Sequence, residues 1–210
     1  MNTTQRILGA AATAALVVVA VPGASGTEEP ANGQWPPPST HGRFLPVPPE
    51  LVAPQTFAAC GDEVTIAPGD VTETEHRVLV TEEGDTVVEY RGAATADITR
   101  ASDDAVLDEF DLSGGGFETW SADGTQVTFD YEGASVVVAF DGIEAAAFAA
   151  AGLPEAFVHL GGRLEETVTF ATPAEVDSGV PAVVSAEVTE NATEYVFDLC
   201  DLLDQAAAQQ

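Results

Sequence analysis

Residues 123–131 read Asp-Gly-Thr-Gln-Val-Thr-Phe-Asp-Tyr, a turn-forming pair followed by alternating polar and apolar side chains. An Asp-Gly pair is a strong signal for a tight hairpin turn, because both residues tolerate the left-handed backbone that such turns need. Val127, Phe129 and Tyr131 then point to one face of a strand, and the polar residues between them point to the other. The stretch therefore predicts an antiparallel hairpin with one buried face.

The same alternation recurs on both sides of this hairpin, with Gly or Asp at spacings of roughly ten residues, a pattern typical of short strands joined by turns. We count about ten strand candidates, an abundance that suits a closed barrel or a two-layer sandwich. We therefore expect an all-β fold, an antiparallel meander that forms a barrel or a two-layer sandwich. The clearest strand candidates are 63–67, 76–80, 88–90, 168–170, 184–188 and 195–200.

One segment departs from the strand pattern and predicts a short helix. Asp141 is a capping residue, Glu144 follows three positions later, and the alanines of 145–151 are strong helix formers. We expect Ile143 and Phe148 on the buried face of this helix, which would cover a sheet edge or one end of a barrel. A second short helix is expected after Cys200, followed by a frayed tail at 205–210.

The two cysteines, Cys60 and Cys200, lie near the two ends of the predicted β-domain, 57–204. In an exported protein this placement predicts a disulfide that ties the first strand to the last. No second pair of cysteines and no His-x-x-x-His motif accompanies them, so a zinc site would lack ligands.

The N-terminus has the features of a secretory signal peptide. Arg6 supplies the positive charge, the apolar run 7–21 is shorter than the ~20 residues that span a bilayer, and the small residues 24–26 suit signal peptidase. We expect cleavage after Gly26 and a secreted, extracellular protein without membrane attachment. An uncleaved N-terminal anchor is the alternative.

Residues 27–56 are rich in proline, which prevents a long helix or a central strand. We expect an extended linker, either a spacer or a segment that lies along the domain with Trp35, Phe44 and Leu45 against it.

The charge of the chain is strongly unbalanced, with 35 acidic residues, six arginines, no lysine and a formal net charge of −29. Such a surface repels nucleic acids and anionic membranes, so neither is expected as a partner. The imbalance is typical of proteins that work in salt or among cations, and a solvated acidic surface also keeps a protein soluble. We expect a monomer.

The order of leader, proline-rich stretch, early cysteine, β-meander and the closing Asp-Leu-Cys-Asp-Leu-Leu of 198–203 resembles small secreted actinobacterial β-rich proteins of uncharacterised function. The resemblance covers residues 57–204. It implies an architecture and a compartment, and it transfers no site.

Motifs for nucleophilic catalysis are absent from the sequence: it has no Gly-x-Ser-x-Gly elbow, and both cysteines are assigned to the disulfide. His76 and His159 are single histidines on predicted strands, where we expect structural roles. The alternative is that they meet on neighbouring strands and bind a metal with Glu75 or Glu155. We expect no catalytic residue and no cofactor.

Four aspartates are candidate metal ligands because they lie close in sequence and hard cations such as calcium bind several oxygens. The Asp-x-Asp-x-Asp-Gly loop of an EF-hand is absent, so diffuse cation binding by the surface is the alternative. Acidic pairs such as 165–166 could also serve glycoside hydrolysis, but their spacing does not separate an active site from a solvated turn. The four metal candidates are Asp103, Asp104, Asp108 and Asp111.

Two classes of function follow, with a third behind them. The first is a non-catalytic module that binds a small molecule, a glycan or a protein partner; the second is a structural or protective envelope protein; the third is a secreted hydrolase with paired carboxylates. A cavity lined by Tyr90, Trp120, Phe129 and Tyr131 would favour the first class. A filled core would favour the second, and a cleft with converging carboxylates would favour the third.

Overall fold

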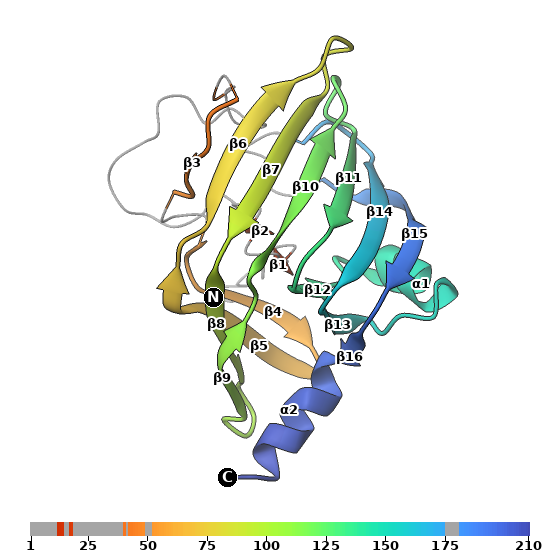
Figure 1. Cartoon of the computed structure of the whole chain (residues 1–210). Helices are drawn as coiled ribbons and strands as arrows, with labels where there is room; N and C mark the ends of the chain where they lie inside the picture. Colours follow the sequence, from red (N-terminus) through yellow and green to blue (C-terminus); the bar gives the residue numbers. More distant parts are fainter. Residues whose placement is uncertain (1–11, 15–16, 19–39, 41, 49–51, 175–180) are drawn as a thin grey trace, which may run out of the picture.

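The computed structural model describes residues 12–14, 17–18, 40, 42–48, 52–174 and 181–210. These residues form three antiparallel sheets and two helices (Figure 1). The predicted all-β class is confirmed. The sheets are open rather than closed, which agrees with a packed sandwich and not with a barrel.

The largest sheet has seven strands and contains the hairpin from which the fold was predicted. Gly124 has φ 69° in the turn of that hairpin, as the Asp-Gly signal requires. In order across the sheet, the strands are β15 (Val183–Thr193), β14 (Gly162–Phe170), β11 (Gln126–Tyr131), β10 (Gly114–Trp120), β7 (Thr86–Gly92), β6 (Glu75–Val80) and β3 (Leu45–Pro46).

Two smaller sheets complete the fold. The four-stranded sheet has the order β4 (Gln55–Ala59), β5 (Asp62–Thr72), β8 (Ala94–Arg100) and β9 (Val106–Asp111). The five-stranded sheet has the order β16 (Val196–Asp198), β13 (Ala156–His159), β12 (Ser135–Val138), β1 (Ala12–Ala14) and β2 (Val17–Val18). The last two strands belong to the predicted leader, most of which lies outside the described residues, so its cleavage stays a prediction.

The five-stranded sheet separates two hydrophobic cores, because β12 and β13 are buried along their whole length. The aromatic core lies against the seven-stranded sheet and consists of Val78, Val88, Tyr90, Trp120, Val127, Phe129, Tyr131, Val137, Phe148, Leu153, Phe157, Leu164, Val168, Phe170 and Val183. The aliphatic core lies against the four-stranded sheet and consists of Phe57, Ala59, Val64, Ile66, Ala96, Ile98, Ala105, Leu112, Val136, Val138, Ala156, Val158, Leu199 and Leu203.

Helix α1 (Gly142–Ala150) forms where the capping signal predicts it. The Asp141 side chain accepts hydrogen bonds from the backbone N–H groups of Ile143 and Glu144. Phe148 is fully buried as expected, but the prediction for Ile143 is wrong, because it is 40% exposed. Residues four apart share a helix face, so the partner of Phe148 in the first turn is Glu144, which is buried.

Helix α2 (Leu199–Ala207) confirms the second predicted helix and shortens the last predicted strand. The strand ends at Asp198 because the Asp198 side chain caps the helix, accepting from the N–H groups of Cys200 and Asp201. The helix continues into the segment expected to fray. Neither helix of the described part of the chain is long and apolar enough to cross a membrane.

The predicted disulfide between Cys60 and Cys200 is present, with 5.2 Å between the two Cα atoms and a sequence separation of 140. It joins the turn between β4 and β5 to the first turn of α2. From the predicted linker, Phe44 lies under two guanidinium groups, 3.5 Å from that of Arg91 and 4.7 Å from that of Arg77. Trp35 lies outside the described residues.

The glycine run 114–116 opens strand β10. A Cβ atom on Gly114 would lie 2.6 Å from the Cα of Gly133, so a side chain there would collide with the neighbouring backbone. The glycines are therefore explained by close backbone packing inside a sheet.

Candidate functional site

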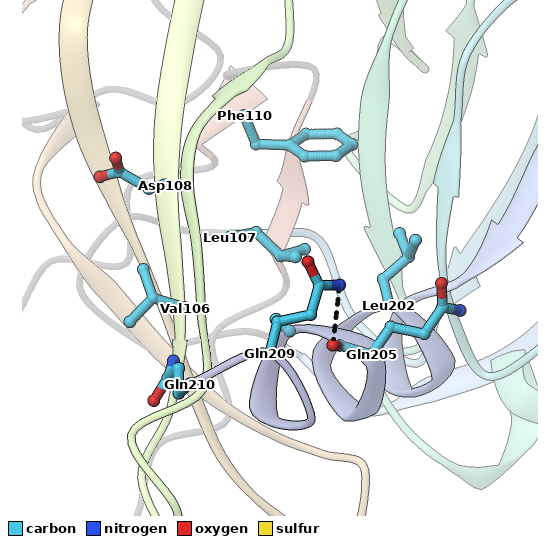
Figure 2. A pocket seen from close by; sticks show the side chains of 9 residues that line it. Val106, Leu107, Asp108, Phe110, Leu202, Gln205, Gln209 and Gln210 are labelled. Carbon is cyan, nitrogen blue, oxygen red and sulfur yellow. Dashed lines mark hydrogen bonds between the residues drawn. The ribbon is translucent and has the colours of Figure 1, made fainter.

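A groove with a volume of about 420 Å³ lies between β9 and α2 (Figure 2). β9 is the outer strand of the four-stranded sheet, and α2 packs against it and against β13 and β16. The groove is lined by Val106, Leu107, Asp108, Phe110, Leu202, Gln205, Ala206, Gln209 and Gln210.

The floor of the groove is apolar because it continues the aliphatic core. Leu107, Phe110 and Leu202 are half-buried and pack against that core. Helix α2 is held there by Leu199 and Leu203, which are both 0% exposed. Figure 2 shows the side chains of Leu107 and Phe110 on the α2 side of β9, and that of Asp108 on its other side.

A β-bulge places both floor residues of β9 on the same side. Leu107 pairs with Ile98 and Phe110 with Ala96, so two residues, Asp108 and Glu109, lie opposite Asp97 alone. Glu109 has φ 48°, and its backbone N–H donates to the Asp97 carboxylate at 2.9 Å. Without the extra residue, Leu107 and Phe110 would point to opposite faces.

Glutamine side chains form the polar rim of the groove. Gln209 Nε2 donates to the backbone oxygen of Gln205 at 3.0 Å, and Gln210 Nε2 donates to the backbone oxygen of Asp104 at 3.3 Å. Each amide also keeps acceptor and donor capacity for a ligand. The lining contains no Ser, Cys, His or Glu side chain, and its one acidic side chain is that of Asp108.

The four candidate metal ligands have separate environments. Asp103 forms an ion pair with Arg100 at 2.7 Å, which lowers the pKa of Asp103. The side chain of Ser113 and, second, its backbone N–H, which donates to Asp111 at 2.8 Å, lower the pKa of Asp111. Asp104 lies exposed in a turn, and Asp108 borders the groove. Among the described residues, no group of three or more His, Cys, Asp or Glu side chains is arranged to hold a metal.

The two strand histidines are not cross-strand neighbours, because β6 and β13 belong to different sheets. His76 stacks on Tyr90 with 6.4 Å between ring centroids, and His159 Nδ1 lies 3.0 Å from the backbone oxygen of Gly133. Burial lowers the pKa of both rings. Their contacts fit the structural roles expected for them.

The four aromatic side chains that were considered as a cavity lining are packed core residues. Tyr90, Trp120, Phe129 and Tyr131 are each at most 4% exposed. Trp120 stacks on Phe170 at 6.2 Å, and Phe129 stacks on Tyr131 at 6.3 Å. All four belong to the aromatic core.

The burial of three glutamates was not predicted from the sequence. Glu118, Glu144 and Glu166 are 1%, 2% and 0% exposed. Glu118 on β10 pairs with Phe129 on β11, which pairs with Glu166 on β14. The side chains of Glu118, Phe129 and Glu166 therefore form one row on the inner face of the sheet. The available signal was that Glu118 and Glu166 stand at strand positions where the alternation calls for buried apolar residues.

The buried glutamates have raised pKa values because burial disfavours the ionised carboxylate. Burial raises the pKa of Glu118 to about 7, although hydrogen bonds from Trp120 and Tyr90 oppose the shift. Burial also raises the pKa of Glu144 and that of Glu166 well above the usual range of a glutamate. None of the three lines the groove.

No protein-family model matches this chain, and neither a curated protein nor a solved structure does.

Proposed function

We propose that this protein is an extracellular, non-catalytic binding module, and that the groove between β9 and α2 holds an apolar side chain from a basic segment of a partner protein. The observation that carries the proposal is the groove itself, an open recess of about 420 Å³ with an apolar floor. The aromatic side chains that were the other candidate lining are packed in a core.

The floor and the rim together favour a peptide as the occupant. Leu107, Phe110 and Leu202 offer a desolvated surface for one apolar side chain, the kind of contact that dominates affinity in protein interfaces. The amides of Gln205 and Gln209 stand beside this floor and can pair with the N–H and C=O groups of a peptide backbone.

Charge favours a basic partner. The chain has a formal net charge of −29, and Asp108 of the groove and Asp201 of α2 are exposed. A field of this sign attracts cationic segments and accelerates their association, and it repels acidic ones.

Strand addition to β9 is disfavoured, so the partner is expected to bind through its side chains. The bulge at Asp108 and Glu109 interrupts the regular spacing of the outer edge, and both residues carry charge. Bulges and charged side chains are the usual means by which edge strands avoid pairing with another chain.

The test is a binding titration with labelled peptides that carry a central leucine or phenylalanine flanked by lysine and arginine. Ala206→Trp fills the groove, and Ala146→Trp places the same side chain on the exposed face of α1 as a control. We expect binding of the basic peptides, a loss of affinity of at least tenfold in Ala206→Trp, and no change in Ala146→Trp.

Other outcomes would replace the proposal. Equal affinity of an acidic peptide would remove the role of charge, and equal affinity of Ala206→Trp would place the site elsewhere. Binding of a glycan or a fatty acid at the groove in place of peptides would change the occupant. If no probe binds, the structural or protective envelope role becomes the better account.

A further inference from the structure

The aromatic core contains two carboxyl groups that face each other between α1 and β14. Glu144 lies in the first turn of α1 and Glu166 in the middle of β14. Helix α1 packs against β15, whose Val188 pairs with Glu166, and the two carboxyl groups are close enough for each to shift the pKa of the other. The Glu144 carboxylate also accepts from the backbone N–H of Phe140. No N–H or hydroxyl group of the described residues donates to either oxygen of Glu166.

The groups that face this pair are acidic or apolar. Arg163 lies on the opposite, outer face of β14, where it pairs with Asp130 and Glu190, and the chain contains no lysine. From the surrounding elements, the facing side chains are Asp141 beside Glu144 at the start of α1, Phe129 on β11, Val188 on β15 and, beyond Phe129, Glu118 on β10.

Two carboxyl groups in such surroundings cannot both be ionised without a large cost. Each anion would lose its hydration, and the two charges would repel each other in a medium of low polarity. One retained proton removes the repulsion and one of the two desolvation costs, and the protonated group donates a hydrogen bond to its ionised neighbour.

We propose that Glu144 and Glu166 keep at least one shared proton that fastens α1 to the seven-stranded sheet up to neutral pH, and that loss of the last proton at alkaline pH releases the helix. Helix α1 carries Phe148, whose ring packs edge-on against Phe157 with 5.4 Å between centroids. Release of the helix therefore uncovers part of the aromatic core and leaves the aliphatic core closed.

The test is amide hydrogen exchange of α1 in the intact, disulfide-bonded protein as pH rises from neutral to strongly alkaline, through the raised pKa of Glu166. After correction for intrinsic exchange, protection of α1 should fall roughly tenfold per pH unit above its midpoint, because opening is coupled to loss of one proton. Glu166→Gln cannot ionise and should abolish this fall. Glu187→Gln removes an exposed carboxylate from β15 and should keep it.

Two further measurements separate this pair from other causes. Infrared spectra of the unmodified protein at neutral pH should show the stretching band of a buried protonated carboxyl group, weakened in Glu166→Gln; its absence overturns the proposal even if that variant does not fold. Glu118→Gln should keep the α1 transition. A pH-independent α1 in the unmodified protein, or the same midpoint in Glu166→Gln, would also refute the shared proton.

Discussion

The aromatic core and the aliphatic core flank the same small sheet, yet they are built from different side chains. The first contains seven aromatic residues, whereas Phe57 is the one aromatic among the buried described members of the second, which includes four alanines. The seven are Tyr90, Trp120, Phe129, Tyr131, Phe148, Phe157 and Phe170. At about 25 cal/mol per Å² of buried apolar area, large rings contribute far more per residue than alanine does.

The two cores are also held closed by different means. The aromatic core encloses three carboxyl groups, and those of Glu144 and Glu166 face no cation among the described residues. The aliphatic core is closed by the disulfide and by Arg100 of β8, which forms ion pairs with Asp103 in the following turn and with Asp204 on α2. The comparison indicates that a core of small side chains depends on covalent and ionic ties, while a core of large rings tolerates groups that oppose folding.

Loss of the disulfide is the largest expected effect and tests this dependence directly. Replacing Cys60 and Cys200 by serine should lower the free energy of unfolding by about 5 kcal/mol, because the bond closes a loop of 140 residues. Urea denaturation measures this loss. Hydrogen exchange should show that β5 of the aliphatic core loses protection before β11 of the aromatic core.

A Cys60→Ala, Cys200→Ala variant controls for the polarity of serine and should behave in the same way. Simultaneous loss of protection in β5 and β11 would contradict the comparison, since it would mean that the two cores unfold as one unit. A change in unfolding free energy below about 1 kcal/mol would show that the aliphatic core needs no covalent tie.

The features that could be predicted from the sequence are those fixed by local pattern. Alternation identified the strands around Phe129, and the positions of Cys60 and Cys200 sufficed for the disulfide. The groove could not be predicted, because it depends on a bulge that turns Phe110 to the same side as Leu107 and on the packing of α2. Glu166 was grouped with its neighbour Glu165 as an acidic pair that could belong to an active site or to a solvated turn, although alternation along β14 places it inside.

The second-largest expected effect concerns Glu118, whose replacement tests whether a carboxyl group in the aromatic core opposes folding when it ionises. Its pKa is about 7 in the folded state, against 4.5 for a glutamate in water, so the folded protein binds this proton more tightly than the unfolded chain does. The stability that depends on the proton is complete below pH 4.5, falls as pH rises, and is lost above pH 7. Glu118→Gln should therefore raise the unfolding free energy by about 3 kcal/mol above pH 7.

Denaturation of this variant at acid and at mildly alkaline pH measures the difference. Glutamine keeps an acceptor for the indole N–H of Trp120, which donates to Glu118 at 3.0 Å. Glu187→Gln on the outer face of β15 is the control and should show no such pH dependence. An equal gain at both pH values would mean that Glu118 disturbs the core by its shape and not by its charge.

Replacement of Arg100 has the smallest expected effect on stability. It compares ion pairs at the edge of a core with ion pairs on an exposed face of a sheet. Arg100→Met keeps the buried stem but removes the ion pairs to Asp103 and Asp204, so it should cost on the order of 1 kcal/mol. Arg163→Met removes a comparable set of pairs from the exposed face of the seven-stranded sheet, where side chains are better hydrated, and should cost less. Added salt should stabilise every variant by screening the net charge of −29, while it narrows the gap between Arg100→Met and the unmodified protein. If Arg163→Met lowers the unfolding free energy as much as Arg100→Met at every salt concentration, the ion pairs of Arg100 contribute no more than ordinary surface pairs. The aliphatic core would then depend on its disulfide alone.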